Sequence, residues 1–404
     1  MTLPTTKMNT LDLNYVRSQF PALSDDYVLM DNAGGSQACR QFINRLSEYY
    51  NKYNVQLGAT YKHSAEAGKE LNEVHHSLQH WIGASQPEEV ICGASTTALL
   101  RILSLCISET WNEGDEIIVT NSDHEANVSP WMDLNKKGFN VKIWKVNQES
   151  MQLELDDLRA LMTDKTRLVA MVHSSNVVGT INDIKKVADI VHDAGALICV
   201  DGVAYAPHRQ VTVSEWDVDF YVFSTYKTYG PHQAIMYGRS EILNAIPGIN
   251  HYFIQSVPYK FQPGNFNFEL TYAMQGVVDY IKALGEGNLE KSYSLIADHE
   301  EVLSEKLLSY LNKLPQVKII GHKKADKSLR VPTISFIHDS LKSSDIVNKT
   351  DTYNIGIRYG DFYARRLIED MDLTSKDGVV RVSMVHYNTV EEVDRLIKAF
   401  ETIL

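Results

Sequence analysis

The chain has 404 residues, four cysteines and a formal net charge of −12 at pH 7. At about 150 residues per domain, this length predicts two or three domains, or one large domain with a smaller second one. An apolar content of 44% and a charged content of 22% are typical of soluble globular proteins and exclude coiled-coil, collagen-like and disordered chains. The acidic balance argues against a nucleic-acid-binding surface, which needs a basic stripe.

No stretch of the chain has the pattern of a membrane span or a targeting signal. No apolar run reaches the roughly 18 residues that cross a bilayer, and the segment 1–26 lacks a basic stretch followed by an apolar one. The cysteines are widely spaced, without a C-x-x-C pair, at Cys39, Cys92, Cys106 and Cys199. This spacing indicates neither a zinc site nor a disulfide framework. We therefore expect no metal, no membrane association and a reducing, cytoplasmic location.

Short β-branched runs alternate with helical patterns in the first two thirds of the chain. The expected strands are Glu89–Cys92, Glu116–Thr120, Val141–Trp144, Arg167–Val172, Leu197–Val200 and Phe220–Phe223. The expected helices between them include Thr96–Ser108, Asp156–Met162 and Asn182–Ala194. This alternation predicts an α/β fold in which helices cover both faces of a mostly parallel sheet.

The pattern changes after about residue 265. Two long helices are expected, over Glu269–Gly285 and Lys291–Lys313, followed by a smaller α+β part with strands at Val331–Phe336, Ile355–Arg358 and Val380–Val385 and an amphipathic closing helix, Thr389–Leu404. The segment Pro258–Asn267 is predicted to be an ordered loop at the junction. We therefore divide the chain into an N-terminal segment (1–26), a large domain (27–268), and a linking helix with a small C-terminal domain (269–404).

Two polar residues follow neighbouring apolar strands. Asp201 ends one expected strand, and Lys227 comes 26 residues later, directly after the next. The carboxyl ends of strands in an open parallel sheet form a ligand crevice. Pyridoxal phosphate needs a lysine amine for its Schiff base and an acid that keeps its pyridine nitrogen protonated. The pair is therefore a candidate cofactor site, although a plain Asp–Lys salt bridge explains it equally well on its own.

Two further features lie at other strand ends. Ser95, Thr96 and Thr97 open a helix directly after a strand, and helix N-terminal N–H groups with nearby hydroxyls bind phosphate. Ser and Thr are also the commonest helix caps, which is the alternative interpretation. His124 follows the strand that ends at Thr120. A flat imidazole there can stack on a cofactor ring and transfer protons, and a surface or capping histidine is the alternative.

These features and others form five motifs in the order and spacing of the class V aminotransferase family, which are fold-type I pyridoxal phosphate enzymes. The motifs are Gly93-Ala94-Ser95-Thr96-Thr97, Asp123-His124-Glu125-Ala126-Asn127, Ser174-Ser175-Asn176-Val177-Val178-Gly179, Asp201-Gly202 and Ser224-Thr225-Tyr226-Lys227-Thr228-Tyr229-Gly230-Pro231. The chain most resembles the cysteine desulfurase and selenocysteine lyase branch, from about Tyr27 to its end. The resemblance implies a large cofactor-binding domain and a smaller C-terminal one.

The resemblance also implies the roles of the cofactor-binding residues. Lys227 would form the Schiff base and move the proton of the substrate α-carbon, Asp201 would pair with the pyridine nitrogen, and His124 would stack on the ring. Asn176 would lie near the phenolic oxygen. The phosphate would be held by Ser95, Thr96, Thr97 and Ser224.

Three more residues are assigned by the resemblance. Arg381 is similar to the arginine that binds the substrate α-carboxylate, a task that suits a planar bidentate donor. Arg358 resembles a second active-site arginine, and a surface arginine at a strand end is the alternative. Asn265 would reach the phosphate of a second subunit, which implies a homodimer with composite active sites.

The chain departs from the family pattern in three places. Desulfurases carry a nucleophilic cysteine just after the second arginine, where this chain has Tyr363, and no cysteine follows Cys199. A persulfide mechanism needs a reactive thiolate; a relocated nucleophile at Cys39 is the alternative, and a small residue at a helix start explains Cys39 more simply. Ala204 replaces a glutamine that would bond the phenolic oxygen, and Tyr226 replaces a histidine.

These departures shape the expected function. We expect a pyridoxal phosphate enzyme that removes a sulfur or selenium substituent from a cysteine-type amino acid by β-elimination, without a persulfide cysteine. An aminotransferase or an amino-acid epimerase is the alternative within the fold. A non-catalytic cofactor-binding protein is the alternative from another class, and it would have no need of Arg381. The expected partners are a small amino-acid substrate and a second copy of the chain, with no nucleic acid.

Overall fold

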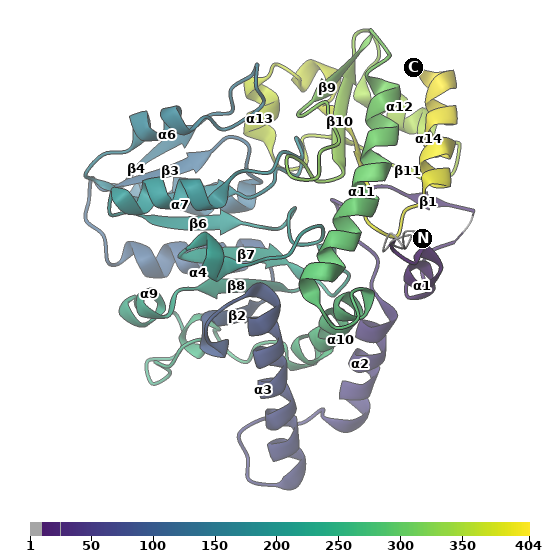
Figure 1. Ribbon diagram of the computed structural model, residues 1–404. Coiled ribbons are helices and arrows are strands. Elements are labelled where there is room, and N and C mark those ends of the chain that lie inside the picture. Colours follow the sequence, from purple (N-terminus) through teal and green to yellow (C-terminus); the bar gives the residue numbers. More distant parts are fainter. Residues whose placement is uncertain (1–9, 25) are drawn as a thin grey trace, which may run out of the picture.

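A seven-stranded sheet forms the centre of the protein, whose computed structural model describes residues 10–24 and 26–404 (Figure 1). The strand order is β2–β8–β7–β6–β5–β3–β4. The strands are β2 (Val90–Gly93), β3 (Glu116–Thr120), β4 (Asn140–Trp144), β5 (Thr166–Val172), β6 (Leu197–Asp201), β7 (Phe220–Ser224) and β8 (Ala234–Gly238). Strand β8 runs antiparallel to β2 and β7, and the other neighbours pair in parallel. The six strands expected in this region are confirmed. Strand β8 was not predicted from the sequence.

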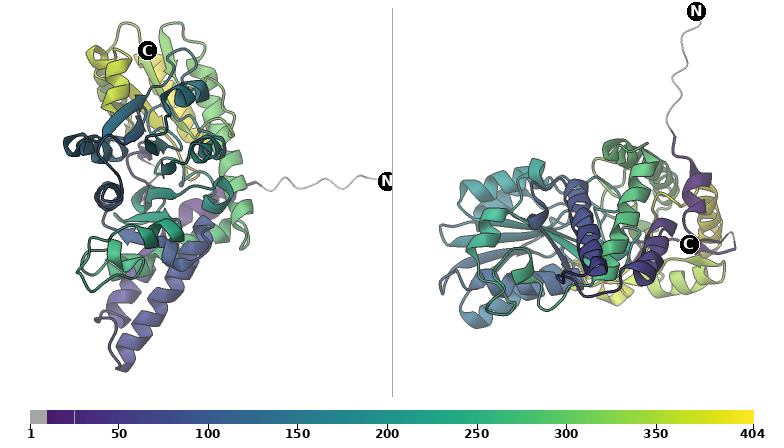
Figure 2. Two further views of the ribbon diagram at one scale, coloured as in Figure 1. Left: turned by 90° about the vertical axis from the view of Figure 1, so that its left-hand side faces the viewer. Right: turned by 90° about the horizontal axis from the view of Figure 1, so that it is seen from below.

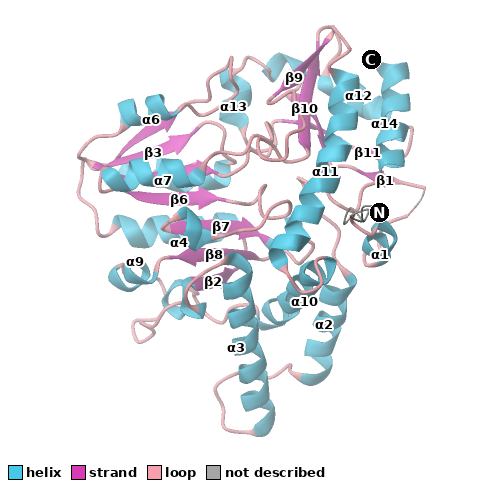
Figure 3. Ribbon diagram, viewed as in Figure 1, coloured by secondary structure: helices cyan, strands magenta, loops and turns pink. Residues whose placement is uncertain are grey.

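Both faces of this sheet are buried, which explains its near-continuous apolar strands. Along β5, Val169 and Met171 face one core, whereas Leu168 and Ala170 face the other, as the two-residue period of a strand requires. Helices α4 (Thr96–Ser108), α5 (Ser129–Met132) and α9 (Ser240–Ala245) cover the second core; α3 (Lys62–Ile82), α6 (Leu155–Leu161), α7 (Ile184–Asp193) and α8 (Val213–Trp216) cover the first. Figure 3 shows this layered arrangement.

Helices α2 (Arg40–Lys52) and α3 extend beyond the sheet in Figures 1 and 2, and α10 (Phe268–Leu284) packs against both. Gly276 lets α10 approach α2 closely, because a Cβ atom at this position would lie 2.5 Å from the backbone of Gln41. Helix α1 (Leu13–Ser18) precedes them, and α11 (Leu289–Leu311) continues from α10 toward the C-terminal part.

The C-terminal part contains a four-stranded antiparallel sheet in the order β12–β13–β10–β9. Its strands are β9 (Val317–Ile320), β10 (Thr333–His338), β12 (Arg358–Gly360) and β13 (Val379–Ser383), with helices α12 (Ser343–Asp351), α13 (Arg365–Asp370) and α14 (Val390–Ile403). The single strand expected over Ile355–Arg358 is a wrong prediction. The chain there forms β11 (Ile355–Gly356), which pairs with β1 (Val28–Leu29), and then turns into β12 in the other sheet.

The N-terminal strand belongs with the C-terminal core. Val28 and Met30 pack in one cluster with Phe336, Val380 and Phe400. The domain limits at residues 26 and 268 stay predictions.

Among the described residues, no helix is both long and apolar enough to span a membrane.

Candidate active site

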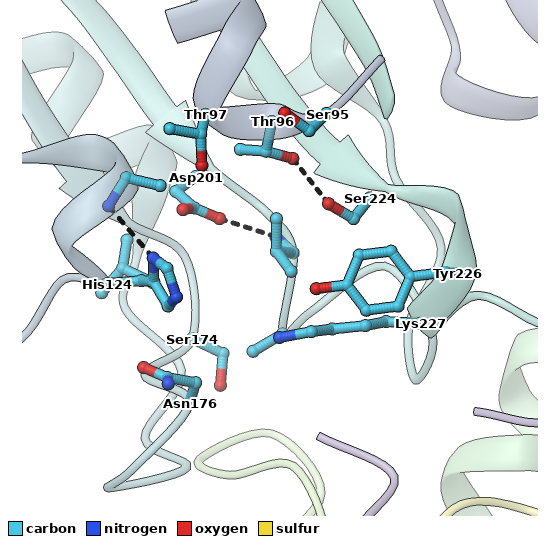
Figure 4. A pocket seen from close by; sticks show the side chains of 14 residues that line it. Ser95, Thr96, Thr97, His124, Ser174, Asn176, Asp201, Ser224, Tyr226 and Lys227 are labelled. Atoms are coloured by element: carbon cyan, nitrogen blue, oxygen red, sulfur yellow. Dashed lines mark hydrogen bonds between the residues drawn. The ribbon is translucent and has the colours of Figure 1, made fainter. Parts of the chain in front are cut away.

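A pocket with about 510 Å³ of empty volume lies at the carboxyl ends of β6 and β7 and the start of α4 (Figure 4). It brings together eight residues that the sequence placed around a cofactor. They are Ser95, Thr96, Thr97, His124, Asn176, Asp201, Ser224 and Lys227. Their convergence follows from the parallel sheet, whose strand ends and following loops meet at one edge.

Asp201 and Lys227 are buried in this pocket. Asp201 is the last residue of β6, and its Oδ1 accepts a hydrogen bond of 2.9 Å from the backbone N–H of Val203. Lys227 lies in the single turn that follows β7. Burial raises the pKa of the Asp201 carboxyl, and burial together with the nearby Arg381 charge lowers the pKa of the Lys227 amine. A lysine with a lowered pKa has more of the neutral amine that attacks a carbonyl carbon.

The start of α4 forms an anion-binding corner beside this pair. The Ser95 hydroxyl caps the helix by accepting the N–H of Ala98 at 3.1 Å. The hydroxyls of Thr96 and Ser224 are 2.8 Å apart, so β7 and α4 present their hydroxyls together. Helix N–H groups and clustered hydroxyls on one small surface suit a phosphate group.

His124 lines the pocket as a neutral ring. Its Nδ1 accepts the N–H of Ala126 at 3.0 Å, so a neutral ring carries its proton on Nε2. Burial and the charge of Lys227 lower the pKa of His124 to about 4. The ring of Tyr363 lies 5.1 Å from it, tilted by 33°. His124 therefore presents an uncharged aromatic face at neutral pH.

Asp123 is a buried carboxyl that the sequence analysis did not single out. Val172 donates a backbone N–H to its Oδ2 at 3.0 Å, Asn127 donates to its Oδ1 at 2.6 Å, and the Thr120 hydroxyl is a third donor. Burial and the charge of Asp201 raise the pKa of Asp123 well above its usual value. These bonds tie the loop that carries His124 to β3 and β5. Its place beside His124 in a recognised motif was the available signal.

Arg381, on β13, approaches the pocket from the C-terminal sheet and is almost fully buried. It donates to Asp31 Oδ1 at 2.7 Å and to the backbone carbonyl of Asn176 at 3.2 Å. Its guanidinium carbon lies 3.7 Å from the centre of the Phe362 ring. Its Nε has no hydrogen-bond partner among the described residues. Arg381 is not among the residues that line the pocket, so its role in binding a substrate carboxylate stays a prediction.

Arg358 lies outside the pocket, although it pairs in register with Arg381 on the neighbouring strand. Its guanidinium lies 3.8 Å from Asp31 Oδ2, and its side chain is more than half exposed. Arg358 and Asp31 border an adjoining hollow, and Tyr226 lines both this hollow and the pocket. The substrate-binding role of Arg358 stays a prediction. Asp31 was not singled out in the sequence.

Asn265 is far from this chain's own pocket. It lies in a separate hollow between α3 and the loop before α10, where it donates to Gln56 Oε1 at 3.3 Å. The structure therefore does not bring Asn265 together with Lys227 within one chain. A role toward a second subunit stays a prediction.

The cysteines are all buried and free. Burial raises the pKa of Cys39 to about 11, that of Cys92 to about 12 and that of Cys106 to about 11, and it raises the pKa of Cys199 well above the usual value. Cys39 lies at the start of α2 with its thiol near the backbone carbonyl of Gly276, at 3.9 Å. This environment favours the structural interpretation of Cys39 over the relocated nucleophile.

The residues of the pocket fit pyridoxal phosphate. A lysine amine, a carboxylate and an anion-binding corner are what the aldehyde, the pyridine nitrogen and the phosphate each need. The neutral His124 ring adds a flat surface. Asn176 also lines the pocket, and its buried Oδ1 has no hydrogen-bond partner among the described residues.

The family described as aminotransferase class-V matches residues 28–396. Aminotransferase-like protein FGM3 of Gibberella zeae is 41% identical over 406 residues, covering 98% of this chain and 99% of that protein. Cysteine desulfurase-like protein ustD of Aspergillus flavus is 36% identical over 398 residues, covering 95% and 89%. A solved cysteine desulfurase from Thermococcus onnurineus shares the fold, with a TM-score of 0.88, 24% identity and coverage of 100% and 98%.

The environment of His124 predicts an acid-sensitive protein. Its folded pKa of about 4 lies below the usual 6.5, so the unfolded chain binds the proton first as the pH falls. Stability is therefore lost between these two values. The prediction concerns the cofactor-free protein, whose free energy of unfolding should fall when the pH is lowered from 7 to 4.5. In His124→Gln this fall should be smaller by about 2–3 kcal/mol, because glutamine binds no proton.

Urea unfolding at a series of pH values measures this difference. The matched control is His63→Gln, an exposed histidine on α3, which should follow the unsubstituted protein. Equal pH slopes for His124→Gln and the unsubstituted protein would contradict the assigned neutral state of His124.

Proposed function

The chain belongs to the class V aminotransferase family of pyridoxal phosphate enzymes, and we propose that it cleaves the bond between the β-carbon and a sulfur substituent of a cysteine-type amino acid. The observation that carries this proposal is the single pocket that combines Lys227, Asp201 and the anion-binding corner of α4. The similarity to a cysteine desulfurase-like protein supports the choice of a sulfur substituent. A selenium substituent or a sulfinate is included in this class.

The pocket residues have distinct tasks in such a reaction. When bound, pyridoxal phosphate supplies an electron sink for bonds broken at the α-carbon. Lys227 would hold the cofactor and, once released, would take the α-proton of the substrate at Nζ, which its lowered pKa favours. Asp201 would keep the pyridine nitrogen protonated through a charge-assisted hydrogen bond. His124 would cover one face of the ring and exclude water.

Arg381 would bind the α-carboxylate of the substrate. Its buried position would place the guanidinium in a water-poor environment, where a charge-assisted hydrogen bond is strong. Phe362 lies against the guanidinium and limits its rotation. Arg358 would contribute positive charge at the entrance, where Asp31 lies between the two arginines.

Sulfur would leave without transfer to the protein. Elimination of the β-substituent followed by hydrolysis gives the sulfur fragment, pyruvate and ammonia. Tyr363 occupies the position where the family resemblance places a nucleophilic cysteine, and the four cysteines are buried with raised pKa values. Free thiols in every described cysteine also fit a cytoplasmic location, which we include in the proposal.

The proposed active form is a homodimer with composite sites. Asn265 and Gln56 border a hollow remote from this chain's pocket, and exposed aromatic side chains lie in the two loops that border it. These side chains are Tyr61, Tyr252, Phe253 and Tyr259. Aromatic groups exposed together are typical of protein–protein interfaces.

The dimer makes a specific prediction for Asn265. Sedimentation velocity of the purified protein should show a dimer, and Asn265→Ala should weaken cofactor binding without abolishing the dimer, because the phosphate loses one donor from the second subunit. Equilibrium dialysis measures the cofactor affinity. An active monomer would contradict both the assembly and the role of Asn265.

A second prediction concerns the cofactor linkage. Borohydride reduction followed by mass spectrometry should locate a pyridoxal phosphate adduct on Lys227. Lys227→Ala should bind the cofactor without a covalent bond and lose at least about a hundredfold in turnover, since the general base is absent. Asp201→Asn should still bind the cofactor but lose most of its turnover, because a neutral amide cannot stabilise the protonated pyridine nitrogen. An adduct on another lysine would contradict the assignment.

A third prediction tests the reaction itself. L-cysteine, S-conjugates, the sulfinate and selenocysteine should be screened with the holoenzyme while sulfide, pyruvate, ammonia, alanine and oxo acids are measured. A Cys→Ser change at all four positions should keep the turnover per bound cofactor, with reduced thermal stability where a hydroxyl replaces a buried thiol.

The screen separates the alternatives. Sulfur release with pyruvate supports β-elimination, and alanine with a protein persulfide would contradict it. Loss of sulfur release in Cys39→Ser alone, with cofactor bound and the protein folded, would assign the nucleophile to Cys39. Oxo acid formed only with an amino-group acceptor would indicate transamination instead, and racemised substrate would indicate epimerisation.

A further inference from the structure

A buried histidine after β13, His386, joins distant parts of the chain through two tyrosine hydroxyls. The hydroxyl of Tyr280, on α10, lies 2.5 Å from its Nε2, and the hydroxyl of Tyr229 lies 3.0 Å from its Nδ1. The Tyr229 hydroxyl also donates to the backbone carbonyl of Pro207 at 2.7 Å. All three side chains are fully buried, and none of them lines the pocket.

The direction of each hydrogen bond in this network is determined. The Pro207 carbonyl can only accept, so Tyr229 gives its proton there and accepts the second hydrogen bond from His386 Nδ1. A ring that carries its proton on Nδ1 leaves Nε2 to accept from the Tyr280 hydroxyl. Burial lowers the pKa of His386 well below its usual value, which keeps the ring neutral. The network is therefore a chain of three bonds that fixes the Tyr229 hydroxyl.

The backbone of Tyr229 is held in an unusual conformation. Its φ angle is 65°, in the left-handed region that non-glycine residues rarely adopt. Its N–H donates to the Ser36 hydroxyl at 2.9 Å, and its carbonyl accepts the N–H of Cys39 at 3.0 Å. Such a conformation persists only where several contacts impose it. The backbone bonds and the fixed hydroxyl together impose it here.

This conformation closes the turn that carries Lys227. The single turn Thr225–Lys227 follows β7, and the Thr225 carbonyl accepts the N–H groups of Thr228 at 2.9 Å and Gly230 at 3.0 Å. Tyr229 lies between these two donors, so its backbone angles determine whether both donors reach the same carbonyl. Release of Tyr229 would open the turn directly after Lys227.

The same network connects the segments that carry the lysine and the buried arginine. Tyr229 comes two residues after Lys227, and His386 follows β13, the strand of Arg381. Burial and the charge of Arg381 lower the pKa of the Lys227 amine to about 8. Both causes depend on where the amine lies, so a change in the turn would change the pKa.

We propose that Tyr229 is a positioning residue for Lys227, whose amine stays buried because the Tyr229 hydroxyl is held by His386 and the Pro207 carbonyl. Tyr229 acts through the backbone of the turn, since its ring does not line the pocket. This inference deepens the proposed function and rests on Lys227 as the reactive amine.

The pH dependence of amine labelling tests the inference without turnover. The full-length, cofactor-free protein is treated with a small amine-specific reagent at a series of pH values, and mass spectrometry follows the peptide of Lys227. The midpoint of this curve reports the pKa of Lys227 independently of how accessible the amine is. In Tyr229→Phe the midpoint should rise by about one pH unit from its starting value near 8, because the amine gains water.

Variants of His386 separate hydrogen bonding from packing. His386→Leu fills a similar space without a donor or an acceptor, so its midpoint should rise as in Tyr229→Phe. His386→Gln carries an amide that can donate to Tyr229 and accept from Tyr280, so its shift should be clearly smaller. This pair also decides the question if Tyr229→Phe does not fold.

Phe20 offers a matched control within the same cluster. Its ring packs edge-on against Tyr229, Tyr280 and His386, with centroid distances of 5.7, 5.2 and 6.0 Å, and it has no polar atom in the side chain. Phe20→Leu should therefore lower the unfolding temperature and leave the midpoint of Lys227 labelling unchanged.

The outcomes distinguish this inference from the proposed function. Midpoints of Tyr229→Phe and His386→Leu that equal that of the unsubstituted protein would overturn the inference, as would an equal shift in Phe20→Leu or in His386→Gln. A shift confined to Tyr229→Phe and His386→Leu supports it. If borohydride traps no pyridoxal phosphate on Lys227 of the unsubstituted protein, the proposed function fails, whereas the labelling curves still measure the positioning of the amine.

Discussion

Asp201 and Lys227 place two ionisable groups of opposite charge out of contact with water at one edge of the central sheet. Asp201 and Lys227 are nearly inaccessible to water, and each would be costly to ionise alone. The attraction between the two charges offsets part of this cost. A bound group that interacts with both Asp201 and Lys227 would offset more of it. Residues of β6 and β7 belong to both apolar cores, which fix the backbone from which these two side chains project.

The C-terminal sheet completes the pocket by delivering a third charge. Arg381 lies on β13 of the C-terminal sheet, and its charge lowers the pKa of the Lys227 amine. A residue of one sheet therefore changes the protonation of a residue at the end of a strand in the other sheet. Asp31 offsets part of this charge through Arg381 and, at longer range, Arg358. Since the Asp31 side chain remains about a third exposed, water screens these ion pairs.

The sequence predicted the strand-end residues well because their signal is local. An apolar run followed by Asp201 or Lys227 determines both the strand and the place of the side chain at its end. Strand β8 was not predicted, although one of its partners, β7, is the preceding strand in the chain. The segments β11 and β12 were predicted as one strand, because their partners β1 and β13 are far away in the chain and belong to two different sheets. The contact between Phe362 and Asn176 had no local signal at all, since positive φ angles at Phe362 and Tyr363 are imposed by tertiary bonds.

Hydrogen bonds hold the turn at Phe362 and Tyr363 in place, which is consistent with the proposed elimination, a reaction that needs no mobile nucleophilic side chain. A loop that carries a thiol to a substrate must be able to move, which requires few contacts with its surroundings. Here the turn is bonded to Glu125, to Asn176 and, through Arg366 on α13, to Glu125 again at 3.1 and 3.2 Å. A segment held by this many bonds is better suited to orienting groups than to transporting one. Tyr363, at the position where the family resemblance expects a cysteine, thus lies in a turn that hydrogen bonds tie to Glu125 and Asn176.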